Sequence, residues 1–454
     1  MTAPTHPKAR NPDAPWPSTR RAAERALLVH LRLSGTALEA QEDVEELRLL
    51  ATSAGAEVIG TVVGRRHTPD AGTFVGKGKA EEVRDLAARE RADVVLVNHA
   101  LSPSQERNLE KVVGCRVLDR VALILDIFAQ RARSHEGKLQ VELAQLEHLS
   151  TRLVRGWTHL ERQKGGIGLR GPGETQLEVD RRLIRDRIKK LNDRLAQVST
   201  QRRSRRRARH KVPIPTVSLV GYTNAGKSTL FNQLTGAGVF AADQLFATLD
   251  PTMRRVELPG NNAVVLADTV GFIRHLPHDL VEAFKSTLEE VADADLLLHV
   301  VDSHHGESLE QMAQVNAVLA DIGAAGIAQA IVFNKIDLSG EPARVEYGDG
   351  KVFARVWLSA RSGEGVELLR ELLAQHYRAY RRVVHLELPA DMGRLRAQIY
   401  ERAEILSETP LQSGGWMMDA AVTPAQLAWL QQQKDYRPEF LRDEALARLA
   451  ATGS

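Results

Sequence analysis

Residues 217–232 read VSLVGYTNAGKSTLFN, and this stretch decides the fold. An apolar run typical of a buried strand leads into G-x-x-x-x-G-K-S and then into a helical pattern, as in a phosphate-binding P-loop. Backbone N–H groups of such a loop curl around phosphate oxygens, and the helix N-terminus adds positive potential. We expect Lys227 to reach the β- and γ-phosphates and the Ser228 hydroxyl to bind Mg²⁺. The predicted contacts here are Gly221, Tyr222, Thr223, Asn224, Ala225, Gly226, Lys227, Ser228 and Thr229.

A second motif follows the next apolar run. Residues 264–267 lead into Asp268-Thr269-Val270-Gly271, a D-x-x-G pattern. Asp268 is placed to hold Mg²⁺ through water, and the Gly271 N–H can bond the γ-phosphate. The segment is therefore expected to distinguish GTP from GDP.

The base is selected by a third motif. Residues 331–333 lead into Asn334-Lys335-Ile336-Asp337, an N-K-x-D pattern. The Asp337 carboxylate can accept from the N1–H and 2-amino groups of guanine, whereas adenine would leave it unpaired. Ser359-Ala360-Arg361 follows another strand, and its backbone is expected to meet guanine O6. All these motifs stand at strand ends, where an open α/β sheet binds its ligands.

Composition excludes several kinds of site and of targeting segment. The chain has 454 residues with one cysteine, Cys115, which excludes an internal disulfide and a cysteine-based zinc or iron–sulfur site. No apolar run approaches a membrane span of ~20 residues. Residues 1–21 are proline-rich with no apolar segment, so we expect a disordered tail rather than a signal peptide, and a cytoplasmic protein.

The basic excess is confined to one stretch. Residues 131–211 carry 22 basic and 9 acidic side chains, whereas residues 212–454 carry 21 basic and 31 acidic ones. Seven basic and no acidic residues lie between Gln201 and Lys211. A solvated helix end would explain an isolated run of this kind. Because the whole stretch shares the charge, we expect a polyanion partner such as RNA.

The same stretch has the periodicity of a pair of helices. Leucines from Leu139 to Leu153, and apolar residues from Leu177 to Val198, recur at about 3.5-residue spacing. Between them lies a glycine-rich segment that cannot be helical, from Gly156 to Gly173. We expect two long antiparallel helices joined by this tip, the second spanning roughly residues 174–205.

The fold class is α/β with a further mixed domain. Strand and helix patterns alternate over residues 22–130 and again over residues 212–380, which predicts parallel sheets with crossover helices. Residues 381–454 are expected to form a small α+β domain. It would contain strands at 385–388 and 416–422 and helices at 394–406 and 424–433.

Switch I is expected between the P-loop helix and the next strand, in Phe246-Ala247-Thr248-Leu249-Asp250-Pro251-Thr252. A threonine hydroxyl here can cap Mg²⁺ and the γ-phosphate. Thr248 and Thr252 both qualify, and position alone does not choose between them.

The chain resembles the HflX family of ribosome-associated GTPases over nearly its whole length after the tail. The most specific stretches lie outside the G motifs. They are LSPSQERNLE (101–110), LILDIFAQRA (123–132), EGKLQVELAQL (136–146) and GGIGLRGPGETQLEVDRR (165–182).

The resemblance implies a Ras-like P-loop GTPase domain preceded by a small parallel α/β subdomain with a helical arm, and followed by a small C-terminal domain. It implies that the protein binds the large ribosomal subunit. The charge of residues 131–211 makes them the segment that we expect to meet rRNA, and we expect the protein to be a monomer. On the subunit it would use GTP to split or rescue stalled ribosomes, especially under heat stress. The resemblance points to Thr248, within Phe246, Ala247, Thr248, Leu249 and Asp250, as the Mg²⁺-binding threonine. The catalytic set is then Lys227, Thr248 and Gly271, with Ser228 and Thr248 as metal ligands.

One position departs from many GTPases. Phe272 follows the D-x-x-G motif, where a water-orienting glutamine often sits. Phenylalanine cannot position water, so either hydrolysis is intrinsically slow or another group is supplied by the chain or its partner. The family pattern is a hydrophobic residue here, so the departure does not indicate a dead enzyme.

Two other functions compete with this reading. One is a signalling switch whose GTP state recruits a protein effector. The other is an RNA chaperone that uses ATP in the N-terminal domain. The candidate phosphate site there, Gly76-Lys77-Gly78-Lys79, lacks a full P-loop, and we interpret it as a structural turn.

Overall fold

The computed structural model describes residues 23–33, 36–156, 176–209, 214–237, 244–259, 262–274, 285–304, 308–379, 382–422, 424–433 and 435–442. The chain divides into two compact units, Met1–Arg120 and Val121–Ser454. The expected N-terminal tail and the glycine-rich tip beyond Gly156 lie outside the described residues. In the described ranges, no helix is long and apolar enough to cross a membrane.

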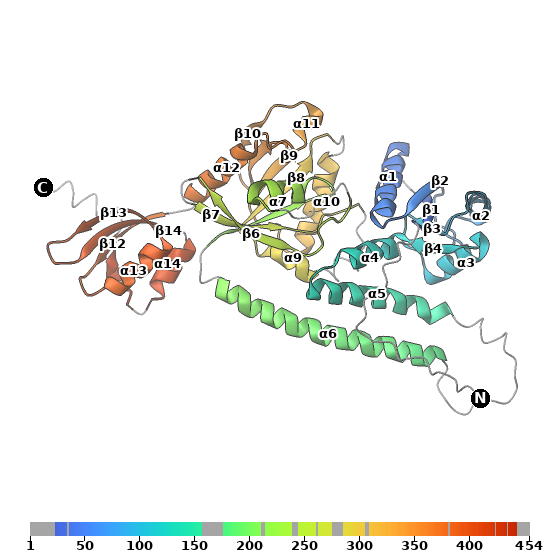
Figure 1. The fold of residues 1–454 in the computed structure, drawn as a ribbon, viewed down its shortest axis with the longest axis horizontal. Helices are drawn as coiled ribbons and strands as arrows, with labels where there is room; N and C mark the ends of the chain where they lie inside the picture. Colours follow the sequence, from blue (N-terminus) through green and yellow to red (C-terminus); the bar gives the residue numbers. More distant parts are fainter. Residues whose placement is uncertain are drawn as a thin grey trace, which may run out of the picture. The chain divides into compact units, whose positions relative to one another are not determined.

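The first unit is a parallel sheet with helical crossovers (Figure 1). Its strands lie in the order β2-β1-β3-β4, and every neighbouring pair is parallel. The elements are β1 (Arg25–Arg32), α1 (Ala37–Ser53), β2 (Glu57–Arg65), α2 (Lys77–Glu90), β3 (Val94–Val97), α3 (Pro103–Val113) and β4 (Arg116–Asp119). Local chemistry sets the helix ends: Ser102 and Gln105 form a capping box at the start of α3, and Gly114 ends it at φ 80°.

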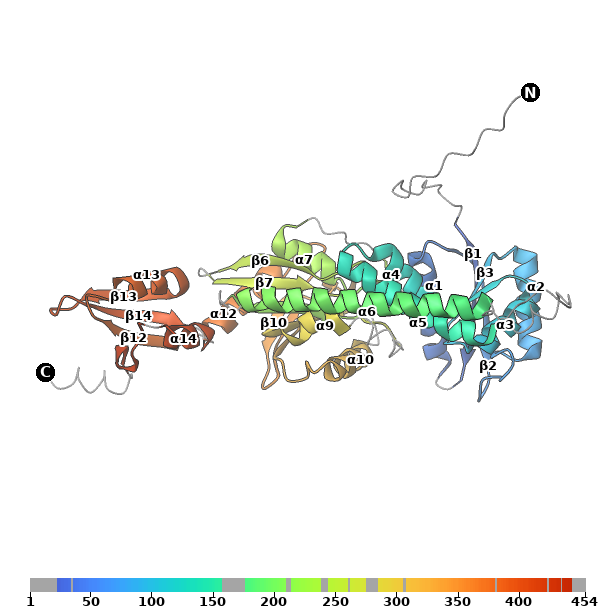
Figure 2. The same cartoon turned by 90° about the horizontal axis from the view of Figure 1, so that it is seen from below.

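Three helices begin the second unit: α4 (Arg120–Arg131), α5 (His135–Gly156) and α6 (Gln176–Arg209). Helices α5 and α6 run side by side in opposite directions (Figures 1 and 2). Leu139, Leu143 and Leu191 form the buried seam between them. An ion pair from Arg187 to Glu142, at 2.5 Å, closes the edge of this seam.

The nucleotide-binding domain is a seven-stranded sheet of order β10-β11-β9-β8-β5-β7-β6. Strands β5, β7, β8, β9 and β11 are parallel, and only the edge strands β6 and β10 are antiparallel. The strands are β5 (Thr216–Gly221), β6 (Thr252–Leu258), β7 (Asn262–Asp268), β8 (Leu296–Asp302), β9 (Gln329–Asn334), β10 (Arg344–Tyr347) and β11 (Val352–Trp357). The helices are α7 (Lys227–Thr235), α9 (Lys285–Ala292), α10 (Ser308–Asp321), α11 (Ile336–Ser339) and α12 (Val366–Ala379). The core is built on side chains such as Leu219 and Phe231, which are fully buried.

The C-terminal part is an antiparallel sheet of order β13-β14-β12-β15 with two α-helices and a short 3₁₀ helix. The elements are β12 (Arg382–Leu388), α13 (Gly393–Arg402), β13 (Glu404–Pro410), β14 (Trp416–Val422), α14 (Pro424–Gln431), η2 (Pro438–Phe440) and β15 (Leu441–Arg442).

One expected helix in this part is wrong over its last four residues, 403–406. The helix expected at 394–406 ends at Arg402, and residues 404–410 form β13, which pairs with β14. Arg396 of α13 binds Glu408 of β13 at 2.6 and 2.8 Å. This tertiary pairing overrides the helical spacing of the local sequence.

Candidate nucleotide-binding site

The loop between β5 and α7 has the backbone of a phosphate-binding site. Asn224 and Gly226 adopt left-handed conformations, with φ of 61° and 94°. Turns of this kind make nests of N–H groups that bind anions. At Gly221 a side chain is excluded, since a Cβ would lie 2.2 Å from the carbonyl oxygen of Val300 on the neighbouring strand β8. Glycine there lets the loop leave the sheet close to its neighbour.

Lys227 is buried at the first position of α7. Its Nζ donates to the carbonyl oxygens of Gly221 at 3.0 Å and Tyr222 at 2.6 Å. Burial lowers the pKa of Lys227 to about 8, partly offset by the charge of Asp268. A phosphate group near Nζ would replace these carbonyl contacts with a charge-assisted pair.

Three oxygen-bearing side chains converge beside the loop. Ser228 Oγ and Thr248 Oγ1 donate to Asp268 Oδ2 at 2.7 and 2.8 Å and lie 2.8 Å from each other. Burial raises the pKa of Asp268, opposed by these hydrogen bonds and by Lys227. Asp268 Oδ1 is buried and has no hydrogen-bond partner among the described residues. An all-oxygen cluster with one unsatisfied carboxylate oxygen suits Mg²⁺ and its bound waters.

The structure separates the two candidate threonines of switch I. Thr248 is buried and reaches Ser228 and Asp268. Thr252 instead begins strand β6, opposite Asp268 in the sheet, and is not among the residues that line the pocket.

The D-x-x-G segment is bound to the P-loop through its backbone. The Thr223 N–H donates to the Phe272 carbonyl at 2.7 Å, and the Phe272 N–H donates to the Gly221 carbonyl at 3.2 Å. Gly271 packs so closely that a Cβ would lie 2.7 Å from Thr223 Cγ2 and 2.8 Å from Lys227 Nζ. Phe272 itself is buried and lines no part of the pocket. It therefore brings no polar group to the phosphate end.

Asn334 ties three loops of the site together. Its Nδ2 donates to the Ala225 carbonyl in the P-loop at 2.8 Å, and its Oδ1 accepts the Ala360 N–H at 2.8 Å. A Cβ at Gly226 would lie 2.1 Å from Asn334 Nδ2. The glycine of the P-loop is therefore required both by its backbone angle and by this amide.

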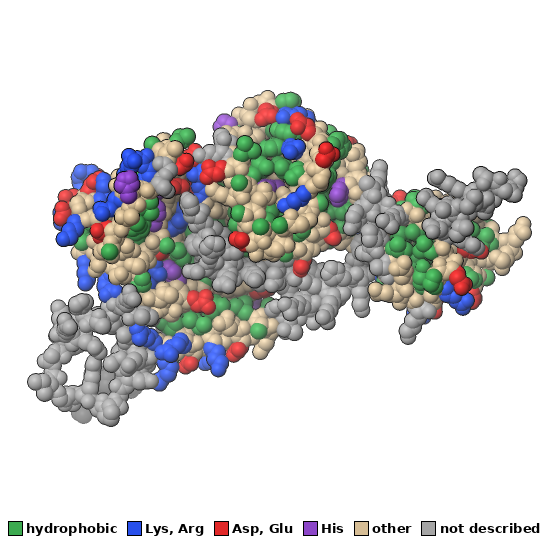
Figure 3. Space-filling view, turned by 180° about the vertical axis from the view of Figure 1, so that it is seen from behind, with side chains coloured by type: hydrophobic (Ala, Val, Ile, Leu, Met, Phe, Trp, Pro, Cys, Tyr) green, Lys and Arg blue, Asp and Glu red, His purple; other side chains and the backbone are tan. Residues whose placement is uncertain are grey.

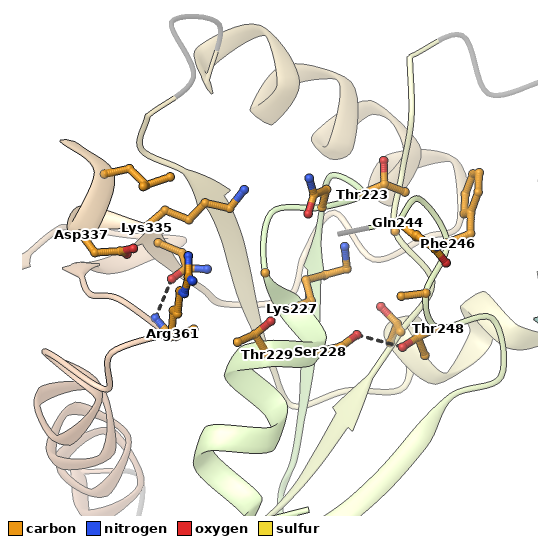
Figure 4. Close-up of a pocket in the computed structure, with 18 residues that line it drawn as sticks. Thr223, Lys227, Ser228, Thr229, Gln244, Phe246, Thr248, Lys335, Asp337 and Arg361 are labelled. Atoms are coloured by element: carbon orange, nitrogen blue, oxygen red, sulfur yellow. Dashed lines mark hydrogen bonds between the residues drawn. The ribbon is translucent and has the colours of Figure 1, made fainter. Parts of the chain in front are cut away.

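The opposite end of the pocket offers a free carboxylate. Lys335 turns the chain at φ 70° and pairs with Asp302 at 2.7 Å. Asp337 follows on the exposed side, and no hydrogen bond or ion pair of its carboxylate is found within the described residues. Figure 4 shows Asp337, Lys335 and Arg361 at one end, and Ser228 and Thr248 at the other.

A pocket of about 430 Å³ joins the two ends. The predicted residues that line it are Thr223, Asn224, Gly226, Lys227, Ser228, Thr229, Phe246, Ala247, Thr248, Thr269, Gly271, Asn334, Lys335, Asp337, Ala360 and Arg361. The predicted residues that do not line it are Gly221, Tyr222, Ala225, Leu249, Asp250, Asp268, Val270, Ile336 and Ser359. Gln244 and Leu338 line it without having been predicted. Leu338 follows N-K-x-D directly and could have been found as a wall for the base, whereas Gln244 carries no signal.

A P-loop, a D-x-x-G and an N-K-x-D at neighbouring strand ends around one pocket define a P-loop GTPase. Residues 216–335 match the family model described as "50S ribosome-binding GTPase". Residues 41–129 match "GTP-binding GTPase N-terminal", and residues 131–209 match "GTP-binding GTPase Middle Region". The chain is accordingly a GTP hydrolase, and its catalytic domain belongs to the family of ribosome-binding GTPases.

Relatives extend this match along the chain. The GTPase HflX of Escherichia coli K12 is 54% identical over 395 residues, covering 87% of this chain and 92% of the relative. The GTPase HflX of Magnetococcus marinus is 49% identical over 398 residues, covering 86% and 90%. A GTP-binding protein from Sulfolobus solfataricus, solved with GDP, is 25% identical with a TM-score of 0.43, covering 77% of this chain and 98% of that one. The chain belongs to the HflX family of GTPases.

Proposed function

We propose that this GTPase binds the large ribosomal subunit and uses GTP binding and hydrolysis to split or rescue stalled ribosomes in the cytoplasm, under stress such as heat. The observation that carries the proposal is the exposed basic face of α6 in the same unit as the GTP pocket. The family membership and the ribosome-binding family model of the catalytic domain support it.

The geometry of the pocket supports the following nucleotide roles. Lys227 binds the β- and γ-phosphates, and the Gly271 N–H bonds the γ-phosphate. Asp337 selects guanine by accepting from its N1–H and 2-amino groups, and residues 359–361 face guanine O6. Thr223 also belongs to this set, because its Oγ1 is buried in the pocket wall with no partner in the described ranges. A phosphate oxygen or an ordered water would satisfy it.

Mg²⁺ would be held by Ser228 and Thr248, with Asp268 behind them binding through water. When bound, the ion neutralises charge on the phosphate oxygens. Thr248 reaches this cluster from switch I, so its position there depends on the conformation of residues 244–250.

The arm supplies the surface for RNA. The basic residues of α6 whose side chains are described and exposed are Arg182, Arg185, Arg187, Lys189, Lys190 and Arg194. Figure 3 shows Lys and Arg side chains gathered along the arm. The more basic run after Gln201 lies on the same helix, and its side chains fall outside the description. Contacts of such residues with phosphates supply affinity without sequence specificity.

Sucrose-gradient sedimentation with ribosomes tests the proposal. With a non-hydrolysable GTP analogue bound, the protein should sediment with the large subunit, and the fraction of intact ribosomes should fall. With GDP both effects should be weak. If the protein stays at the top of the gradient at low salt with either nucleotide, the signalling-switch reading replaces this one.

A further inference from the structure

A switch I carboxylate binds the turn that leads into helix α5. The helix itself is capped by Ser134, whose Oγ accepts the Gly137 N–H at 2.8 Å. Asp250 Oδ2 accepts the backbone N–H groups of Arg133 and Ser134, both at 2.7 Å, and Asp250 Oδ1 accepts the Ser134 hydroxyl at 2.5 Å. Both N–H groups precede the first helical residue, His135, where the positive end of the helix dipole favours a carboxylate. Asp250 is among the residues predicted to contact nucleotide, and in the structure its carboxylate binds Arg133 and Ser134, just before α5.

Gly137, inside the first turn of α5, leaves room for this carboxylate. A Cβ at Gly137 would lie 2.2 Å from Asp250 Oδ1 and 3.0 Å from Ser134 Oγ. Glycine is a destabilising choice within a helix, so its presence here needs a reason. The close approach of Asp250 supplies that reason.

Two more contacts join switch I to the same junction. The rings of Phe246 and Phe128 meet edge to face with centroids 4.7 Å apart. The Arg131 guanidinium donates to the Gln244 side chain. Phe246 and Gln244 also line the nucleotide pocket (Figure 4). Residues 244–250 thus touch the pocket on one side and the α4–α5 junction on the other.

We propose that Asp250 is a positioning residue for GTP hydrolysis, because its bond to the start of α5 holds Thr248, two residues earlier, at the Mg²⁺ position. This rests on the metal role proposed above for Thr248. The same contact couples the arm to the nucleotide site. A rotation of α5 would move Thr248, and loss of the γ-phosphate would weaken the bonds of Asp250 to Arg133 and Ser134.

Gly137→Ala tests the proposal from outside the pocket. The added methyl group displaces Asp250, while alanine favours the helix itself. We expect the Mg²⁺ concentration for half-maximal hydrolysis to rise about tenfold, a change of ~1.4 kcal/mol. Affinity for a fluorescent GTP analogue should fall relative to the GDP analogue, and amide exchange of residues 244–250 should speed up. Asp250→Ala should do the same, and Ser134→Ala should do so more weakly.

Gly393→Ala is the matched control. Gly393 begins helix α13 with open space around its Cβ position, so this variant should behave as the wild type in all three measurements. If Gly137→Ala and Asp250→Ala both keep wild-type Mg²⁺ dependence and amide exchange, the proposal is wrong. The contact of Asp250 with Arg133 and Ser134 then only stabilises the fold. Absence of GTP hydrolysis by the wild type would instead defeat the proposed function.

Discussion

Among single residues, Lys227 is the one whose charge depends most directly on the state of the site. Its pKa of about 8 arises from burial, and anionic phosphates nearby would raise that pKa. GTP binding therefore takes up a proton above pH 8. Well below that pH the lysine is already charged, and its contribution to the pH dependence of affinity vanishes.

We expect GTP affinity to fall about fivefold between pH 7 and pH 8.7, as the free protein loses the Lys227 proton. Lys227→Arg keeps the charge at every pH and serves as the control. Any titration of the nucleotide affects both proteins equally and cancels in the comparison. His299, buried behind the site, has its pKa lowered to about 4 by burial and stays neutral throughout this range. Calorimetric titration at each pH measures the effect; equal slopes in wild type and variant would rule out Lys227 as its source.

Asp337→Asn should exchange guanine for xanthine as the preferred base. The amide can donate to the 2-oxo group of xanthine, whereas it no longer accepts from both donors of guanine. GTP affinity should drop about 100-fold, since two hydrogen bonds to a charged acceptor are lost. Competition between the two triphosphates gives the ratio. Unchanged guanine preference would show that another residue reads the base.

Local motifs predict the site residues that act through their own backbone or through the next few residues. The P-loop and N-K-x-D lie where their spacing places them because each sits at a strand end. Asp250 illustrates the limit: its partners, Arg133 and Ser134, are more than a hundred residues away along the chain. Nothing near Asp250 in the sequence indicates a helix start as its partner.

At the level of elements, α6 should carry the salt dependence of ribosome binding. Neutralising Arg185, Lys189, Lys190 and Arg194 together should lower the slope of log affinity against log salt by about 3, since each phosphate contact contributes ~0.7–0.9. All four side chains are exposed.

The matched control removes the same charge elsewhere, at the exposed residues Lys111, Arg254, Lys351 and Arg394. Its salt slope should stay at the wild-type value. If both quadruple variants shift the slope equally, net charge rather than the arm is responsible.

Periodicity predicts elements that pack along one face and fails where pairing is distant. The leucine seam of α5 and α6 was visible because its spacing repeats, and Leu139, Leu143 and Leu191 do pack together. Helix α4 was not predicted, because residues 120–131 continue an apolar strand pattern without a turn signal. The expected helix at 394–406 ran into the first three residues of strand β13, and the strand itself was missed. Its partner β14 and the Arg396–Glu408 pair lie outside the local stretch of sequence.

For the whole molecule, basal hydrolysis should be slow and large ribosomal subunits should accelerate it. Phe272 is buried and offers the attacking water no polar group, so the free protein lacks the usual orienting side chain. A partner that orders switch I and supplies its own groups would stabilise the transition state more than the ground state.

Steady-state phosphate release with and without purified large subunits, at matched salt, measures this. We expect an increase of tenfold or more, lost in the α6 quadruple variant and kept in its control. If the free protein is already as fast as the bound one, an in-chain group must orient the water, and Thr223 becomes the first candidate.

The two hydrogen bonds of the Asn334 side chain affect the release of GDP. The side chain binds the Ala225 carbonyl on one side and the Ala360 N–H on the other, so it links the base loop to the P-loop. Opening the base loop to release GDP would therefore have to break one of these two hydrogen bonds, at a cost of about 1 kcal/mol.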